Sequence, residues 1–175
     1  MAFRRIVMAG MAVGVSLALG LLGAAPASAG VVGGGGKPSA RELVPSGLPV
    51  TFIGRSGQAC AFDVTISEVA NNEFARTFPN GNTLITGRLV VRVTNDLSKQ
   101  SVVRDVSGPV LITSGPSGEQ VFVLSGASVS PVFAGHDDTG SGLQGLFIFH
   151  GPTVFTDGQL TQVSGNYEDL CRTLA

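Results

Sequence analysis

The two cysteines, Cys60 and Cys171, constrain the fold more than any other feature of this chain, because they stand at opposite ends of its patterned part. Cys60 opens the first clear strand pattern, residues 60–69, and Cys171 lies four residues before the last residue. A bond between them would tie the first strand to the last element, which favours a closed or sandwiched all-β domain. We therefore predict a Cys60–Cys171 disulfide, with two buried free thiols as the alternative.

Residues 1–29 have the three parts of a secretory signal peptide. Arg4 and Arg5 give a positive start, residues 6–22 form an apolar run, and Ala27-Ser28-Ala29 is a small-residue cleavage site. We therefore expect a secreted protein, extracellular or in the cell envelope, with no stable membrane span after cleavage. The pattern leaves the general and the twin-arginine export routes open. Export would place the cysteines in a compartment that permits disulfides.

The charge balance argues against partners with dense negative charge. The chain has 11 Lys plus Arg and 12 Asp plus Glu, and cleavage after residue 29 removes two arginines, so the mature chain would carry a net charge of −3. Proteins that bind nucleic acid usually present a basic patch, which this balance does not favour. We expect neither nucleic acid nor an anionic membrane surface as a partner.

Residues 30–47 have the composition of a flexible tether. Four glycines stand at 33–36, Pro38 and Pro45 follow, and the segment has no apolar periodicity. We therefore expect three parts in the chain: a signal peptide at 1–29, a tether at 30–47 and a single β-domain at 48–175.

The β-domain is predicted from apolar residues that alternate with polar ones, the period of a half-buried strand. Residues 60–66 and 88–93 both show this alternation. Asn80-Gly81 and Asp157-Gly158 are typical of two-residue hairpin turns, which need positive φ at both central positions. Gly87 is expected to bend a strand or mark a bulge. Gly108-Pro109 is expected to turn the chain, and Gly151-Pro152 to separate two strands.

These signals predict eight or nine short strands and no long amphipathic helix after residue 29. Strands joined at short intervals by turns favour an antiparallel meander. Closure into a small eight-stranded β-barrel is the simplest arrangement, because it removes exposed sheet edges. A two-sheet β-sandwich is the alternative.

The patterned part of the chain resembles a family of small secreted actinobacterial proteins of unknown function. The resemblance covers about 115 residues and depends on Cys60-Ala61-Phe62, on Gly-bounded strands rich in Val, Thr and Asn, and on the ending at residues 163–171. It implies a small β-barrel, similar in shape to lipocalins or to the allene oxide cyclase barrel. It implies no activity, and therefore no catalytic residue.

Few residues could support chemistry, and we predict neither a catalytic site nor a metal or cofactor. His136-Asp137-Asp138 is the one dense titratable group, but it lacks the distal glutamate of a calcium loop, and two histidines are too few for a zinc site. A solvated loop is the simpler interpretation. His150, which ends an aromatic strand, is expected to be buried or half-buried and bonded to a backbone carbonyl.

The apolar alternation predicts one inward-facing set, which would form an apolar lumen with Glu68 near its mouth. The set comprises Phe62, Val64, Ile66, Leu89, Val91 and Val93. Residues 120–124 and 145–150 are apolar on both faces, so their second face should meet a loop, another subunit or a ligand.

These features lead to a functional hypothesis with one main alternative. We expect a secreted, non-enzymatic binding protein for a small apolar ligand or an envelope protein, with a homo-oligomer also open. The alternative is a barrel-cyclase-like enzyme acting on a small apolar substrate. A structural exoprotein with residues 30–47 as a spacer is a third reading.

Overall fold

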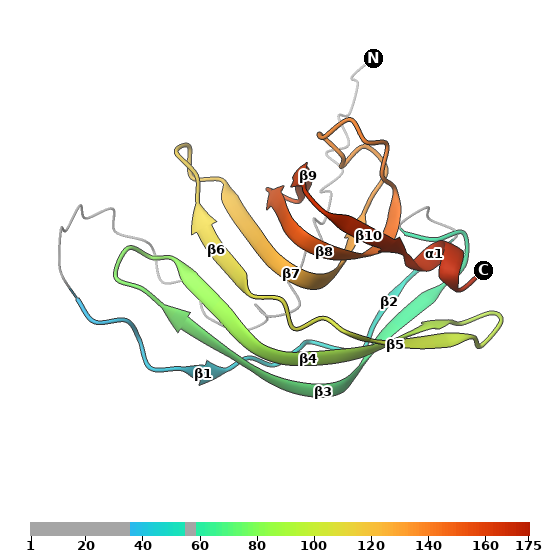
Figure 1. The fold of residues 1–175 in the computed structure, drawn as a ribbon, viewed down its shortest axis with the longest axis horizontal. Helices are drawn as coiled ribbons and strands as arrows, with labels where there is room; N and C mark the ends of the chain where they lie inside the picture. Colours follow the sequence, from blue (N-terminus) through green and yellow to red (C-terminus); the bar gives the residue numbers. More distant parts are fainter. Residues whose placement is uncertain (1–35, 55–58) are drawn as a thin grey trace, which may run out of the picture.

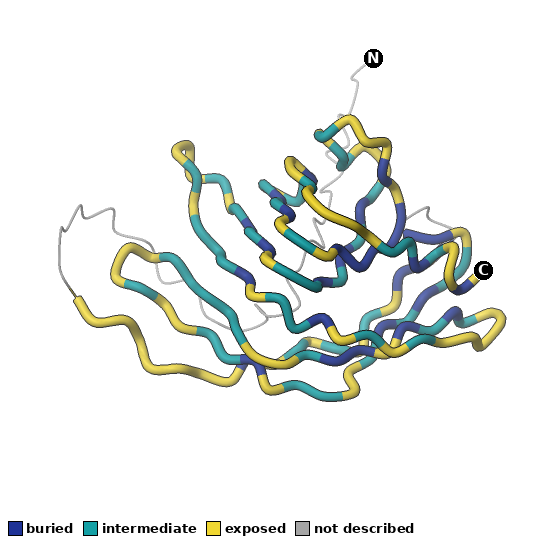
Figure 2. Tube along the Cα trace, viewed as in Figure 1, coloured by how far each residue is buried: buried dark blue, intermediate teal, exposed yellow. Residues whose placement is uncertain are grey.

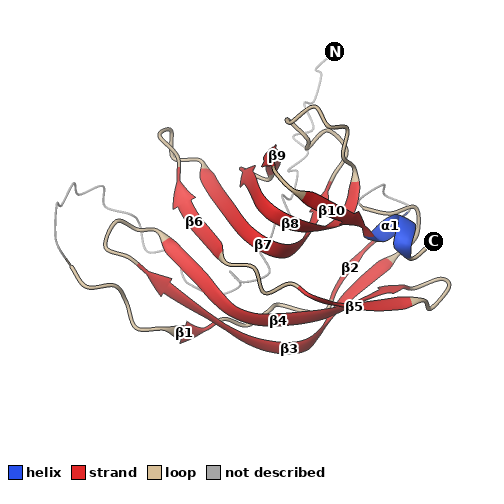
Figure 3. Cartoon of the chain, in the orientation of Figure 1, coloured by secondary structure: helices blue, strands red, loops and turns tan. Residues whose placement is uncertain are grey.

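The computed structural model describes residues 36–54 and 59–175, and the predicted signal peptide lies outside these residues. The described part contains ten strands and one short helix (Figures 1 and 3). The elements are β1 (Glu42–Leu43), β2 (Val50–Phe52), β3 (Val64–Thr77), β4 (Thr83–Asn95), β5 (Ser101–Asp105), β6 (Val110–Ser114), β7 (Gln120–Val132), β8 (Gly145–Thr156), β9 (Gln159–Val163), β10 (Asn166–Asp169) and α1 (Leu170–Thr173). The predicted all-β, antiparallel class is confirmed.

All ten strands belong to one sheet, in which each neighbouring pair is antiparallel. β3 pairs with β4, β7 pairs with β8, and β6 joins β4 to β7. β1 and β2 pair with β3 at one edge, and β9 and β10 pair with β8 at the other. The sheet bends so that β3 and β4 face β8 (Figure 1).

The predicted closure into an eight-stranded barrel is not supported, because the sheet stays open. Among the described residues, no strand pairing joins the β1 and β2 edge to the β9 and β10 edge. The barrel prediction assumed that exposed edges would be removed by closure. Here both outer edges are instead divided into short strands, and a covalent link and the helix α1 connect them at one end.

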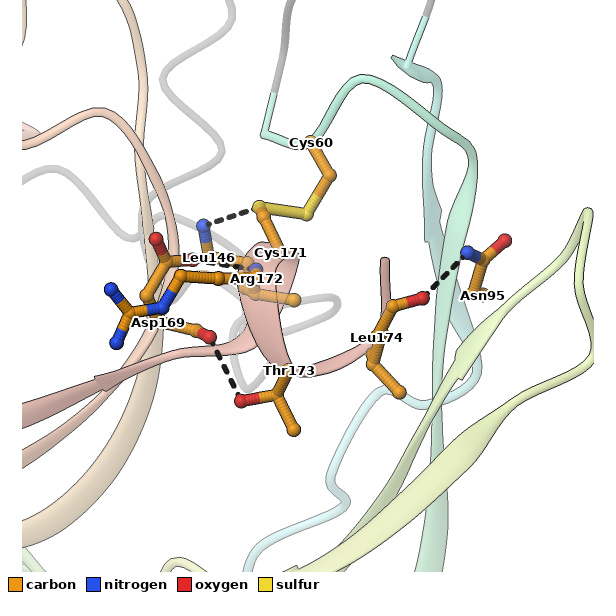
Figure 4. Close-up of a disulfide and its surroundings, with 8 residues drawn as sticks. All are labelled: Cys60, Asn95, Leu146, Asp169, Cys171, Arg172, Thr173 and Leu174. Atoms are coloured by element: carbon orange, nitrogen blue, oxygen red, sulfur yellow. Dashed lines mark hydrogen bonds between the residues drawn. A yellow bond between two sulfur atoms is a disulfide. The ribbon is translucent and has the colours of Figure 1, made fainter.

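The covalent link is the predicted disulfide between Cys60, in the loop before β3, and Cys171, in α1 (Figure 4). The Cα atoms lie 5.2 Å apart across a sequence separation of 111 residues. The surrounding contacts hold α1 against the sheet: the Asn95 side-chain amide donates to the Leu174 carbonyl at 2.8 Å, and the Leu146 N–H approaches Cys171 Sγ at 3.4 Å. The confirmed pairing therefore connects the two ends of the open sheet.

A row of five glycines crosses the sheet along its bend. The register pairs Gly126 with Gly151 directly. The other glycines align when each register is continued two residues beyond its last pair. The β4–β6 register then pairs Gly87 with Gly108, the β6–β7 register pairs Gly108 with Gly126, and the β8–β9 register pairs Gly151 with Gly165. The members of the row, in order across the sheet, are Gly87, Gly108, Gly126, Gly151 and Gly165.

The glycines of this row are required because the backbones approach closely. A Cβ on Gly151 would lie 2.5 Å from the Ser164 carbonyl oxygen, and a Cβ on Gly165 would lie 2.5 Å from the His150 carbonyl oxygen. Gly151 also has a φ of +140°, which L residues rarely adopt. Gly108-Pro109 therefore does not turn the chain as predicted, and Gly151-Pro152 does not separate two strands but lies within the single strand β8. Both Gly-Pro pairs lie at the glycine row, where the backbones of neighbouring strands approach closely and the sheet bends.

Two apolar clusters pack on the two faces of β8, which is why residues 145–149 are buried throughout (Figure 2). Leu146 and Ile148 pack between the layers against Ile66 and Val93. Phe147 and Phe149 pack on the opposite face with Leu160 of β9. The second face predicted for this apolar strand thus meets the chain's own loop and edge strand.

The described part of the predicted tether lies along β3. Glu42 and Leu43 form β1, the Ser39 N–H donates to the Thr77 carbonyl at 2.8 Å, and Val44 is buried. Pairing with a sheet edge uses backbone groups, so it needs no apolar periodicity in the added segment. The assigned boundary at residue 48 therefore falls within a segment that contacts the domain.

Candidate functional site

An apolar cavity of about 90 Å³ lies between the segment Val44–Leu48 and the bent sheet. Strands β3, β4, β6 and β7 supply most of its wall. The main aliphatic contributors are Ile66, Leu89, Val91, Val106, Val110 and Leu124. The polar side chains in the lining are Ser46, Glu73 and Ser128. An apolar hollow with a few fixed polar groups is the usual form of a small-molecule site.

Hydrogen bonds to β3 hold the segment Val44–Leu48 over the cavity. The Val44 N–H donates to the Glu73 carbonyl at 2.9 Å, and the Asn71 side-chain amide donates to the Val44 carbonyl at 2.8 Å. The Ser46 hydroxyl donates to the Glu68 carboxylate. Because these bonds involve three residues of β3, the segment forms a fixed wall of the cavity.

A β-bulge in β3 places Glu73 in this wall. The β3–β4 register shifts between Glu68 and Ala70, which leaves Val69 as the extra residue. The extra residue exchanges the inward-facing and outward-facing positions of the strand beyond the bulge. Odd-numbered residues such as Glu73 therefore lie on the face that carries the even-numbered Ile66 before it. Strict alternation from Ile66 would have placed Glu73 on the opposite face, and our sequence analysis did not identify this residue. The break in the apolar pattern at residues 67–70 was the available signal.

The Glu73 side chain is an unusual group to find here, because it exposes only 9% of its surface. Burial raises the pKa of its carboxyl group, and the nearby negative charge of Glu68 raises that pKa further. Among the described residues, no hydrogen bond or ion pair to the Glu73 carboxylate contributes to this shift. The cavity lining therefore includes one residue, Glu73, whose carboxyl group has no hydrogen-bond or ion-pair partner among the described residues.

A second polar group in the lining also lacks a partner. Ser128, on β7, exposes 5% of its surface, and its buried hydroxyl makes no hydrogen bond within the described part of the chain. Buried polar groups are normally hydrogen-bonded, so each exception calls for an explanation. Glu73 and Ser128 come from different strands and both line one small space.

The structure divides the six candidate lumen residues between the cavity and the packed core. Ile66, Leu89 and Val91 line the cavity. Val64 and Val93 are fully buried in the cluster between the layers, and Phe62 packs against this cluster while remaining half-buried. Glu68 is exposed, beside Ser46 at the solvent side of the lining.

The loop that contains His136 is organised around Asp137. Its carboxylate accepts hydrogen bonds from the Thr139 N–H and hydroxyl, the Ser141 hydroxyl and the Leu143 N–H, at 2.5–3.1 Å. The hydrogen bond from the Thr139 hydroxyl makes the largest contribution to lowering the pKa of Asp137 to about 2. These oxygens are engaged in shaping the loop, and the described residues contain no cluster of three or more metal-ligating side chains.

The prediction for His150 is wrong, because this residue is exposed. Phe147 and Phe149 occupy one face of β8 and Leu146 and Ile148 the other, and both faces are buried up to residue 149. The strand then reaches its bend at Gly151, where His150 turns to solvent. The side chain therefore has no place in the cavity lining.

Arg104 and Glu168 form an ion pair across the opening between the layers. The guanidinium of Arg104, on β5, donates two hydrogen bonds to the Glu168 carboxylate of β10, at 2.7 and 2.8 Å. These bonds lower the pKa of Glu168. Because both side chains are partly shielded from solvent, the pair contributes to holding β5 against β10.

A second hollow, of about 280 Å³, lies on the outer face of β3 and β4. Arg41 and Arg76 contribute to its lining, and the Arg41 guanidinium stacks 4.6 Å above the Phe74 ring. Both arginines are exposed, so their charge is screened by solvent. The inner cavity is therefore the better candidate site.

No family model, curated protein or solved structure matches this chain. In the described residues, no helix has the length and apolar character needed to cross a membrane. The fold and the cavity define a disulfide-linked antiparallel β-protein with an apolar cavity between the segment Val44–Leu48 and the bent sheet.

Proposed function

We propose that this protein is a secreted, non-enzymatic binding protein whose inner cavity holds a small apolar ligand. The observation that supports the proposal is the aliphatic cavity between the segment Val44–Leu48 and the bent sheet. Its volume of about 90 Å³ is below the ~150 Å³ of an engineered apolar cavity that binds benzene. The expected occupant is thus a group of about four carbon atoms.

Export is part of this proposal and depends on the signal-like residues 1–29, with the disulfide as a compatible feature. A small concave apolar cavity favours a small ligand over an envelope protein, because a protein partner would bind a larger surface. The ligand would lie between two facing layers of an open sheet, where the sequence analysis expected a closed barrel lumen.

A cyclase-like enzyme is the second candidate, and the raised pKa of Glu73 is the observation that favours it. Carboxyl groups with raised pKa values often act as acids or bases in catalysis. The described lining, however, joins Glu73 only with two serine hydroxyls as polar side chains. We prefer binding because, among the described residues, the remaining wall offers no second acid, base or cation.

Titration with 1-butanol, followed by NMR of the Ile66, Leu89 and Val91 methyl groups, tests the proposed binding function. We expect saturable shifts at these methyl groups. Ser128→Leu should fill the cavity and abolish the shifts, whereas Ser125→Leu, an exposed position on the same strand, should preserve them. Absence of saturable shifts in the wild-type protein would contradict the proposed function.

A further inference from the structure

The unpartnered polar groups in the cavity indicate which chemistry its ligand carries, and this inference rests on the proposed binding function. Glu73 is about nine-tenths buried and belongs to the cavity lining, and its carboxyl group has no hydrogen-bond donor or cation from the described residues. A buried carboxylate is unfavourable unless it is paired and hydrogen-bonded. The described residues therefore provide a cavity and a carboxyl group, but no positive group to pair with that carboxyl group.

The electrostatic surroundings of Glu73 favour a positively charged ligand over an acidic one. Glu68, on the same strand, is the ionisable neighbour whose charge acts on Glu73 among the described residues. The two carboxylates raise the negative potential at one side of the cavity, while the rest of the lining is mainly aliphatic. An anionic ligand would be repelled by both groups, whereas a cation would be attracted by both.

The geometry points to a small aliphatic amine as the ligand, and we propose that its ammonium group binds Glu73 while its alkyl chain occupies the cavity. An ammonium group provides three N–H donors. One can bind the Glu73 carboxylate, and the Ser128 hydroxyl, which also lacks a partner, can accept another. The alkyl chain replaces contacts with water by contacts with Leu89, Val91 and Leu124.

The cavity size restricts this ligand class to short chains or to the short apolar end of a longer amine. A volume of about 90 Å³ accommodates about four carbon atoms, as judged from the ~150 Å³ cavity that holds benzene. n-Butylamine is therefore a suitable probe. Its analogues 1-butanol and butyrate keep a similar chain and change the polar group to a neutral or a negative one.

The test compares the dissociation constants of these three probes for the full chain at neutral pH, measured from the methyl shifts of Leu89 and Val91. We expect n-butylamine to bind about tenfold or more tightly than 1-butanol, because charge-assisted hydrogen bonds are about twice as strong as neutral ones. Butyrate should bind more weakly than the alcohol. Glu73→Gln should reduce the preference for the amine to about twofold or less, whereas Glu42→Gln, an exposed control, should retain it.

The outcomes distinguish this inference from the proposed function on which it rests. Equal binding of amine and alcohol by the wild-type protein, or a preference for the alcohol, would overturn the amine assignment and leave apolar binding in place. An unchanged amine preference in a folded Glu73→Gln variant would overturn the role of Glu73. If none of the three probes binds, both the proposed function and the amine assignment are wrong. The wild-type comparison decides the question even if Glu73→Gln fails to fold.

Discussion

Substitution of Gly151 by alanine tests whether the glycine row determines the bend of the sheet. Two separate costs follow from the structure. The φ of +140° would place alanine in a conformation that costs roughly 1–3 kcal/mol. The new Cβ would also lie 2.5 Å from the Ser164 carbonyl oxygen, and relieving such overpacking costs roughly 1–3 kcal/mol. We expect Gly151→Ala to lower the free energy of unfolding by about 2–6 kcal/mol in total.

Gly118→Ala is the matched control for this prediction. Gly118 also has a positive φ, +90°, but a Cβ there would meet no atom within 4 Å. It should therefore show the conformational cost alone, and Gly151→Ala should be less stable than the control by about 1–3 kcal/mol. Urea unfolding of both variants, with the disulfide intact, measures this difference. Equal losses of stability in the two variants would refute the argument that close backbone approach fixes the bend.

Three further predictions concern the disulfide and two carboxyl groups. Removal of the disulfide by Cys60→Ser with Cys171→Ser should lower the free energy of unfolding by roughly 4–5 kcal/mol in the chain-entropy model, and urea midpoints that match the wild type would contradict this. Glu73→Gln should stabilise the protein at pH 7, because a folded-state pKa raised above 4.5 makes the ionised carboxyl group unfavourable; this gain should disappear below about pH 4.5 in thermal scans, and a gain that is independent of pH would argue against it. Asp137→Asn should remove a stabilising contribution that is present above about pH 4 and lost as the pH falls through about 2; acid-unfolding curves that coincide for variant and wild type would show that the Asp137 hydrogen bonds do not contribute.

The features that the sequence predicts well depend on local chemistry. The turn between β3 and β4 lies at Asn80-Gly81 as predicted, but it is a three-residue loop, Pro79-Asn80-Gly81, closed by the Phe78 N–H donating to the Asn82 carbonyl at 2.8 Å. Of the two predicted central residues, only Gly81 has a positive φ. Asp157 and Gly158 both have positive φ, as the hairpin prediction required. The disulfide pairing could be predicted because the chain contains only two cysteines.

The features that the sequence analysis missed depend on how strands align. Gly108 and Gly151, each followed by proline, have the local signature of turns, and only the register shows that they belong to one row across the sheet. The bulge at Val69 reverses the inside and outside assignment for the second half of β3. For this reason simple alternation along β3 places Val64 and Ile66 on the inner face before the bulge, but places Glu73, after it, on the wrong face.

The open sheet was missed for a similar reason. Closure into a barrel was predicted from the need to protect sheet edges. Short edge strands, the helix α1 and the ion pair between Arg104 and Glu168 can also protect the edges. The ion pair joins residues that are far apart in the chain. Alternation within one strand carries no information about such contacts.

A crystal structure of the full chain soaked with n-butylamine would test the central claim most directly. We expect density for the butyl chain between Leu89, Val91 and Leu124, with the ammonium nitrogen within hydrogen-bond distance of the Glu73 carboxylate. The same soak of Glu73→Gln should give lower occupancy of the amine in the cavity, comparable with that of 1-butanol. Density for the amine only outside this cavity, or a wild-type cavity closed by repacked side chains, would contradict the account.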